Sequence, residues 1–116
     1  MNCYNMVSDV IEEATKQFSP IYQINDEYED VLEQYCDAID ELGAEVSAEG
    51  FYVDVDEITM NISIGVISPE FTLTEYYKIF CDLLKRSVGF RVIRDDDNEN
   101  IITMFIFPPI WEKTIK

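Results

Sequence analysis

The chain has 116 residues, with 24 Asp and Glu side chains, 8 Lys and Arg side chains and no histidine, so its formal net charge is −16. This length suits one domain over residues 1–116, and 47% apolar residues are enough to form its core. The lack of histidine excludes a Ser-His-Asp triad, a Cys-His dyad and histidine metal ligands. The negative charge disfavours direct binding to nucleic acid or to an anionic membrane.

The cysteines and the N-terminal region indicate the cellular compartment. Cys3, Cys36 and Cys81 are odd in number and lack CxxC spacing, which argues against a disulfide framework or a zinc site. No apolar run reaches the roughly 18 residues of a membrane span, and the first 20 residues carry three carboxylates where a signal peptide would be basic and then apolar. We therefore expect a cytoplasmic protein with reduced thiols.

Helical periodicity occurs twice in the first 42 residues. Apolar side chains recur at helical spacing over residues 7–18, and the following Ser-Pro pair ends this segment because the residue before proline is held out of the helical region. The second segment begins at Asp26, which forms a capping-box pattern with Glu29, and its apolar stripe continues to Leu42. Two N-terminal helices are therefore predicted.

The remainder of the chain is predicted to form strands before and after a third helix. Alternating apolar and polar residues predict a hairpin over 51–66, with a further short strand at 45–47, and a last hairpin joins 90–94 to 101–107. A capping box opens a helix over 72–84. The predicted fold is α+β, with an antiparallel sheet of four or five strands interrupted by the third helix, in the order ααβ(β)βαββ, and helices packed on one face.

The negative charge lies almost entirely in the first half of the chain. Residues 1–57 carry 16 acidic side chains and one basic one, a net charge of −15, whereas residues 58–116 carry 8 acidic and 7 basic side chains, a net charge of −1. Lys16 is the single cation of the first half. This asymmetry indicates a charged face on one domain.

The second helix concentrates this charge. At 100° per residue its carboxylates cover an arc of about 160° opposite the apolar stripe, with one charge per roughly 3 Å of helix, close to the spacing along one DNA strand. Such an arc is also the solvated face of an ordinary amphipathic helix, but that face would mix Glu with Lys, whereas these neighbours repel one another. The expected partner-binding residues are Asp26, Glu29, Asp30, Glu33, Asp37, Asp40, Glu41, Glu45, Asp54 and Asp56.

Two other sets of acidic residues point only weakly to a catalytic or metal site. Asp54 and Asp56 stand at i and i+2 on one strand face, about 7 Å apart, which would suit a divalent metal or an acid-base pair in an enzyme. They lack the neighbouring Glu-x-Lys of a nuclease-like site. The oxygen-rich run at 95–100 lacks the central glycine and closing glutamate of a calcium loop, which favours a solvated turn. We therefore expect no catalytic residue, no metal and no cofactor.

The C-terminal segment 104–111 is apolar on both strand faces. One interpretation is a central strand whose flank is covered by Trp111 and the tail. The other is a surface for self-association, and thus a homodimer, through Phe105, Phe107 and Trp111.

The charge pattern favours a non-enzymatic inhibitor that binds a basic, nucleic-acid-binding protein and excludes its DNA or RNA. In size and charge the chain resembles small acidic proteins of phages and mobile elements, including DNA mimics and some anti-CRISPR proteins. The alternative is an immunity protein or a secretion-type chaperone for a basic or partly unfolded protein. The element order after residue 25 is similar to that of the dimeric acidic chaperones of type III secretion, and the apolar C-terminal strand would then carry the binding.

Overall fold

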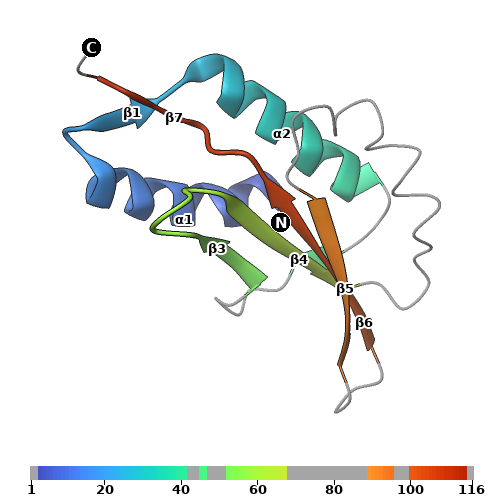
Figure 1. Cartoon of the computed structure of the whole chain (residues 1–116). Coiled ribbons are helices and arrows are strands. Elements are labelled where there is room, and N and C mark those ends of the chain that lie inside the picture. Colours follow the sequence, from blue (N-terminus) through green and yellow to red (C-terminus); the bar gives the residue numbers. More distant parts are fainter. Residues whose placement is uncertain (1–2, 42–44, 47–51, 68–88, 96–99, 115–116) are drawn as a thin grey trace.

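The computed structural model describes residues 3–41, 45–46, 52–67, 89–95 and 100–114 (Figure 1). These residues form two helices and seven strands, an α+β arrangement, and none of their helices is both long and apolar enough to cross a membrane. The elements are α1 (Cys3–Phe18), β1 (Tyr22–Ile24), α2 (Asp26–Glu41), β2 (Glu45–Val46), β3 (Val53–Val55), β4 (Ile62–Ile67), β5 (Gly89–Asp95), β6 (Asn100–Phe107) and β7 (Trp111–Lys113).

Both N-terminal helices form where the apolar periodicity predicted them, but the start of α2 differs in its cap. The side-chain oxygen of Asn25 accepts a hydrogen bond from the backbone N–H of Tyr28 at 3.2 Å, and its carbonyl accepts one from Glu29 at 3.0 Å. Asn25 is therefore the N-cap, and the expected capping box opened by Asp26 was wrong by one residue, because Asp26 is already helical.

A five-stranded antiparallel sheet lies beside the helices, in the order β2-β4-β6-β5, and β3 pairs with the same strand, β4, as β2 does. In the central pair, Ile62 of β4 stands opposite Phe107 of β6, and Ile64 stands opposite Phe105. Side chains alternate between the two faces of a strand. This register therefore aligns apolar residues of both strands on the face toward the helices.

The expectation of a single antiparallel sheet was wrong. β1 and β7 form a second, two-stranded antiparallel sheet, in which Ile24 stands opposite Trp111. Neither strand was expected, because three residues are too short to show a period of two. The described part of the chain contains two helices, and the third expected helix, over 72–84, lies outside the described residues.

The segment between β3 and β4 forms a turn where a strand was expected from Ile58 onward. The Asp56 side chain accepts hydrogen bonds from the backbone N–H groups of Ile58 and Thr59, both at 2.8 Å, and Met60 adopts a positive φ of 61°. Those N–H groups are therefore unavailable to a strand ladder. β4 begins only at Ile62.

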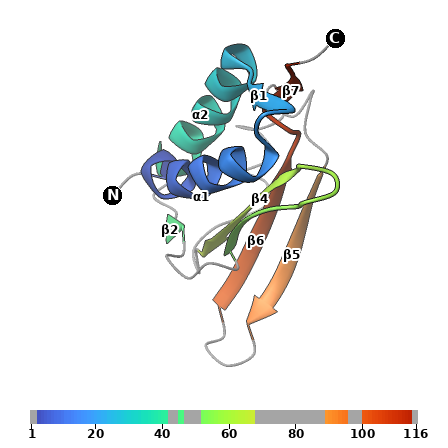
Figure 2. The same cartoon turned by 90° about the vertical axis from the view of Figure 1, so that its left-hand side faces the viewer.

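The two helices pack on one face of the larger sheet (Figure 2). α1 lies between α2 and β3 (Figure 1), and the core fills the space beneath both helices. Trp111 closes one end of this core by packing edge-on against the Phe18 ring at 5.1 Å. The deeply buried core side chains include Val7, Ile11, Leu32, Tyr35, Cys36, Ile39, Ile62, Ile64, Val66, Phe105, Phe107 and Ile110.

Candidate functional site

The outer face of α2 presents carboxylates to solvent. Helical spacing separates these residues from the buried stripe that includes Leu32 and Ile39, because positions on opposite sides of a helix cannot face the same sheet. In residues 3–41, which contain both helices, there are 11 acidic side chains and one basic one, Lys16. The exposed predicted residues of this face are Asp26, Asp30, Glu33, Asp37 and Glu41.

Two other predicted α2 carboxylates contact α1. Asp40 accepts hydrogen bonds from the backbone N–H of Cys3 through both of its oxygens, at 3.0 and 3.2 Å. Glu29 accepts a hydrogen bond from the Tyr4 hydroxyl. Partial burial and then the neighbouring charge of Glu29 raise the pKa of Tyr4 well above its usual range. Asp40 and Glu29 thus join the two helices, and both are only partly exposed.

Tertiary packing adds a carboxylate that the sequence did not single out. Glu12 of α1 and Glu29 of α2 line the same groove of about 290 Å³ between the helices, together with the apolar Ile11 and Ile24. The one cation of this region, Lys16, also borders the groove, and its Nζ lies 3.6 Å from the Glu13 carboxylate. Helical spacing alone could place Glu12 on an exposed face, but it could not place α1 beside α2.

We call six exposed carboxylates, five on the outer face of α2 and one of α1 beside the groove, the acidic surface. Like charges at this density create a negative potential of several kT that extends about a Debye length, roughly 8–10 Å, into solution. Such a field attracts cations and repels anions. The acidic surface comprises Asp26, Asp30, Glu33, Asp37 and Glu41 of α2 and Glu12 of α1.

Asp54 and Asp56, two of the predicted strand carboxylates, do not extend this surface. Val53 and Val55 point into the core beneath the helices, so Asp54 between them points to the opposite face of the sheet. Asp56 is exposed but holds the turn after β3, where backbone hydrogen bonds from Thr59 and Ile58 lower the pKa of its carboxyl. Glu45 lies in β2 at the sheet edge, and its side chain is outside the described part of the structure.

The three residues considered for self-association lie in the interior of this chain. Phe105, Phe107 and Trp111 are 2%, 1% and 4% exposed. β6 runs between β4 and β5, as the central-strand interpretation predicted, and the Phe107 ring packs against Tyr35 with centroids 4.5 Å apart. Trp111 donates a hydrogen bond from Nε1 to the Thr15 hydroxyl at 3.0 Å. These contacts use the aromatic side chains for packing within one chain.

The described residues offer little for covalent or metal chemistry. No three Cys, Asp or Glu side chains among them gather closely enough to hold a metal ion. Cys3 and Cys36 are buried together between the helices, and the hydrogen bond with Cys3, then burial, raise the pKa of the Cys36 thiol. A thiol with a raised pKa is a poor nucleophile at neutral pH. Charge is the chemical property that distinguishes this surface.

No protein-family model matches the sequence, and no curated protein or solved structure shows significant similarity to it. Function is therefore inferred from the charges, contacts and cavities of the chain itself.

Proposed function

We propose that the protein binds and inhibits a basic, nucleic-acid-binding protein through the acidic surface. One observation carries the proposal: α1 and α2 lie side by side on the same face of the sheet, in a stretch with 11 carboxylates and one cation. The partner's groove for DNA or RNA would be occupied by carboxylates in place of phosphates. The protein would act without catalysis, in the cytoplasm, in the manner of a DNA mimic or an anti-CRISPR inhibitor.

The physical mechanism is competition between two polyanions. Complementary fields accelerate association by up to several powers of ten, and salt weakens that attraction. The repulsion between Glu33 and Asp37 at i, i+4 destabilises the free helix by a few tenths of a kcal/mol, which a cationic partner would remove. Binding therefore gains from relief of repulsion as well as from direct contacts.

A pair of matched charge variants tests this proposal. Asp30→Asn with Asp37→Asn removes two charges from the acidic surface, whereas Asp54→Asn with Glu57→Gln removes two exposed charges elsewhere. Proteins captured from lysate by the wild-type chain at low salt would be identified and purified. Each would then be bound to labelled DNA or RNA and titrated with the three forms of the protein, with fluorescence anisotropy as the measurement.

We expect the wild-type chain and the Asp54/Glu57 variant to displace the nucleic acid, and the Asp30/Asp37 variant to do so several-fold less well. High salt should weaken the displacement. Nucleic acid that stays bound to every captured protein, or equal displacement by both variants, would refute the proposal.

The alternative of an immunity protein or secretion-type chaperone would use the apolar C-terminal strand. Phe105 and Phe107 of that strand are packed into the core, so we favour the acidic surface.

A further inference from the structure

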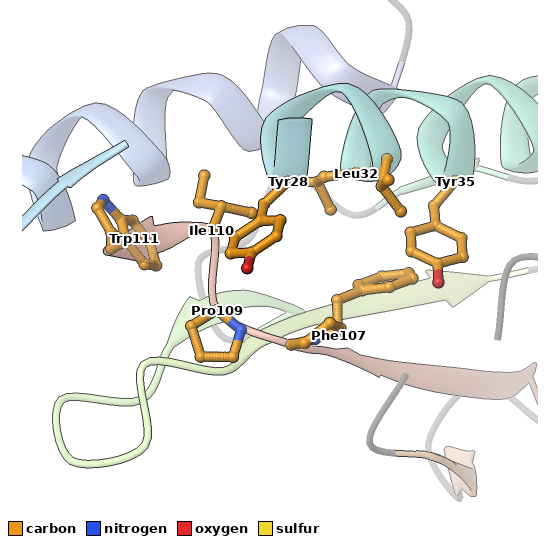
Figure 3. A pocket seen from close by; sticks show the side chains of 9 residues that line it. Tyr28, Leu32, Tyr35, Phe107, Pro109, Ile110 and Trp111 are labelled. Atoms are coloured by element: carbon orange, nitrogen blue, oxygen red, sulfur yellow. The ribbon is translucent and has the colours of Figure 1, made fainter. Parts of the chain in front are cut away.

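An apolar pocket opens on the side of α2 that faces away from α1. Its volume is about 460 Å³, within the range of roughly 300–1,000 Å³ of typical ligand pockets. One wall is formed by α2, and the other is formed by the chain from Phe107 to Trp111, which links β6 to β7 (Figure 3). Tyr28, Leu32 and Tyr35 descend from α2 toward this linking segment.

The pocket has a buried floor and an accessible rim. Leu32, Tyr35 and Ile110 are only 1–2% exposed, whereas Tyr28 at the rim is 38% exposed. Pro109 lies across from the Tyr28 ring in Figure 3 and lines the pocket without adding charge. All nine lining residues are apolar or aromatic. Such a lining favours an aliphatic or aromatic group and disfavours a charged one inside the cavity.

No carboxylate lines the pocket, but two stand next to or near its lining residues along the chain. Glu27 is exposed and stands four residues before the lining residue Val31, which places both on one edge of α2. At the other end, Glu112 follows Trp111 directly and accepts a hydrogen bond from the Asn25 side chain at 2.9 Å, beside the start of α2. An occupant that carries positive charge next to an apolar group would match both the rim and the interior.

We propose that this pocket anchors an apolar side chain from a basic segment of the partner that the acidic surface attracts; the inference rests on the proposed function. Exposed charge pairs speed association but add little affinity, whereas one apolar anchor in a buried pocket often dominates it. A second copy of this chain is disfavoured as occupant because it would bring its own −16 charge to an acidic rim. The pocket thus supplies affinity and the acidic surface supplies attraction.

The one tryptophan of the sequence makes this testable, because Trp111 lines the pocket. Two tryptophan-free peptides would serve as probes: both consist of Lys and Gly, one has a central Leu-Phe pair, and the other has Ser-Ser in its place. We expect the Leu-Phe peptide to bind about tenfold or more tightly than the Ser-Ser peptide and to change the Trp111 emission. The Ser-Ser peptide should bind weakly, lose binding in salt and leave that emission unchanged.

Two variants assign the binding to the pocket. Tyr28→Ser opens the rim and should remove most of the advantage of the Leu-Phe peptide while leaving the Ser-Ser peptide unaffected. Ile58→Ala is the control, because Ile58 is an exposed apolar residue, 91% exposed, in the turn between β3 and β4. It should change neither affinity. Circular dichroism checks the fold of both variants, and the comparison of the two peptides on the wild-type chain requires no variant.

The outcomes separate this inference from the proposed function. Equal affinities with unchanged Trp111 emission would overturn the anchor and leave the acidic surface as the binding site. The Leu-Phe peptide could instead bind more tightly than the Ser-Ser peptide with an affinity that changes neither with salt nor in the Asp30→Asn, Asp37→Asn variant. That result would overturn the proposed function and retain the pocket as an apolar anchor. Benzene that alters Trp111 emission at lower concentration than the Leu-Phe peptide would assign the pocket to a small molecule and overturn the anchor.

Discussion

The backbone N–H of Cys3 donates to both carboxylate oxygens of Asp40, although the two residues are 37 positions apart. The first N–H groups of a helix have no partner within it, and a carboxylate near its N-terminus also interacts favourably with the helix dipole. Asp40 therefore caps α1 from the neighbouring helix. A residue that appears in the sequence as one more charge of an acidic face holds the two helices together.

Replacing Asp40 by alanine should lower the free energy of unfolding by about 1 kcal/mol, the typical effect of removing an N-cap. The measurement is urea denaturation followed by circular dichroism. Asp37→Ala is the matched control, because Asp37 is exposed on the same helix and alanine there removes repulsion from neighbouring acids. Equal losses in the two variants would contradict the capping role.

The Thr15 hydroxyl joins α1 to the C-terminal strand. It accepts a hydrogen bond from Trp111 Nε1 at 3.0 Å and donates one to the Ile11 carbonyl at 2.7 Å. Thr15→Val keeps the shape but leaves the indole N–H of a buried tryptophan unpaired, so the free energy of unfolding should fall by about 1–3 kcal/mol. Thr15→Ser keeps the hydroxyl and should remain close to wild type. A valine variant as stable as the serine variant would show that this hydrogen bond is unimportant.

Gly65 is required by the Tyr52 ring that lies over it. A Cβ atom at Gly65 would stand 2.7 Å from Cδ1 and 3.0 Å from Cβ of Tyr52. Gly65→Ala should therefore destabilise the protein by about 1–3 kcal/mol through overpacking, although alanine ordinarily suits a strand better than glycine. In a Tyr52→Ala background, which removes the ring and keeps only its Cβ, the same substitution should cost clearly less. Chemical denaturation of the four proteins measures this coupling, and additive effects would contradict it.

The carboxyl of Asp56 should make the free energy of unfolding depend on pH in the acidic range. Hydrogen bonds from Thr59 and Ile58 lower the pKa of its carboxyl below the ordinary 3.8. A carboxyl whose pKa is lower in the folded state than in the unfolded state stabilises the fold. This contribution is complete at pH values above the ordinary pKa and is lost as pH falls through the lower pKa of the folded state. An NMR titration of the Asp56 carboxyl should show a midpoint below 3.8.

Two substitutions at Asp56 check the same point. Asp56→Ala should be less stable than the wild type at neutral pH, and the difference should shrink as pH falls below the ordinary value of 3.8. Asp56→Asn retains a side-chain oxygen for the turn without the charge, so its stability relative to alanine should not vary with pH. A constant difference between wild type and Asp56→Ala across this range would contradict the role of the carboxylate.

Periodicity predicted the elements that bury one long face. Over residues 7–18 and 26–41 the apolar spacing predicted both helices, and the alternation around residues 62–66 and 101–107 predicted the two central strands, because each pattern repeats several times. The three-residue strands β1 and β7 repeat too few times to be recognised, and they form only because Ile24 and Trp111 meet across the fold. Short elements of this kind depend on their partners.

The candidate site shows the same division. The outward direction of Asp30, Glu33 and Asp37 followed from helical spacing alone. The contact of Asp40 with Cys3 did not follow from helical spacing. Nor did the position of Asp54, which lies on the sheet face opposite the helices and so away from the acidic surface. Residues far apart in the sequence determine these positions through packing and hydrogen bonds.

The sequence by itself determined the charge asymmetry, the two helices and the outward carboxylates of α2, because composition and helical spacing are local properties. The tertiary structure decided which carboxylates form one surface and which hold the fold together. It also decided that Trp111 and Tyr28 line one pocket. These relationships join segments that are distant in the sequence, from Asp40 with Cys3, 37 positions apart, to Tyr28 with Trp111, more than 80 apart. Burial of the shared core brings the segments together, and no local pattern encodes such contacts.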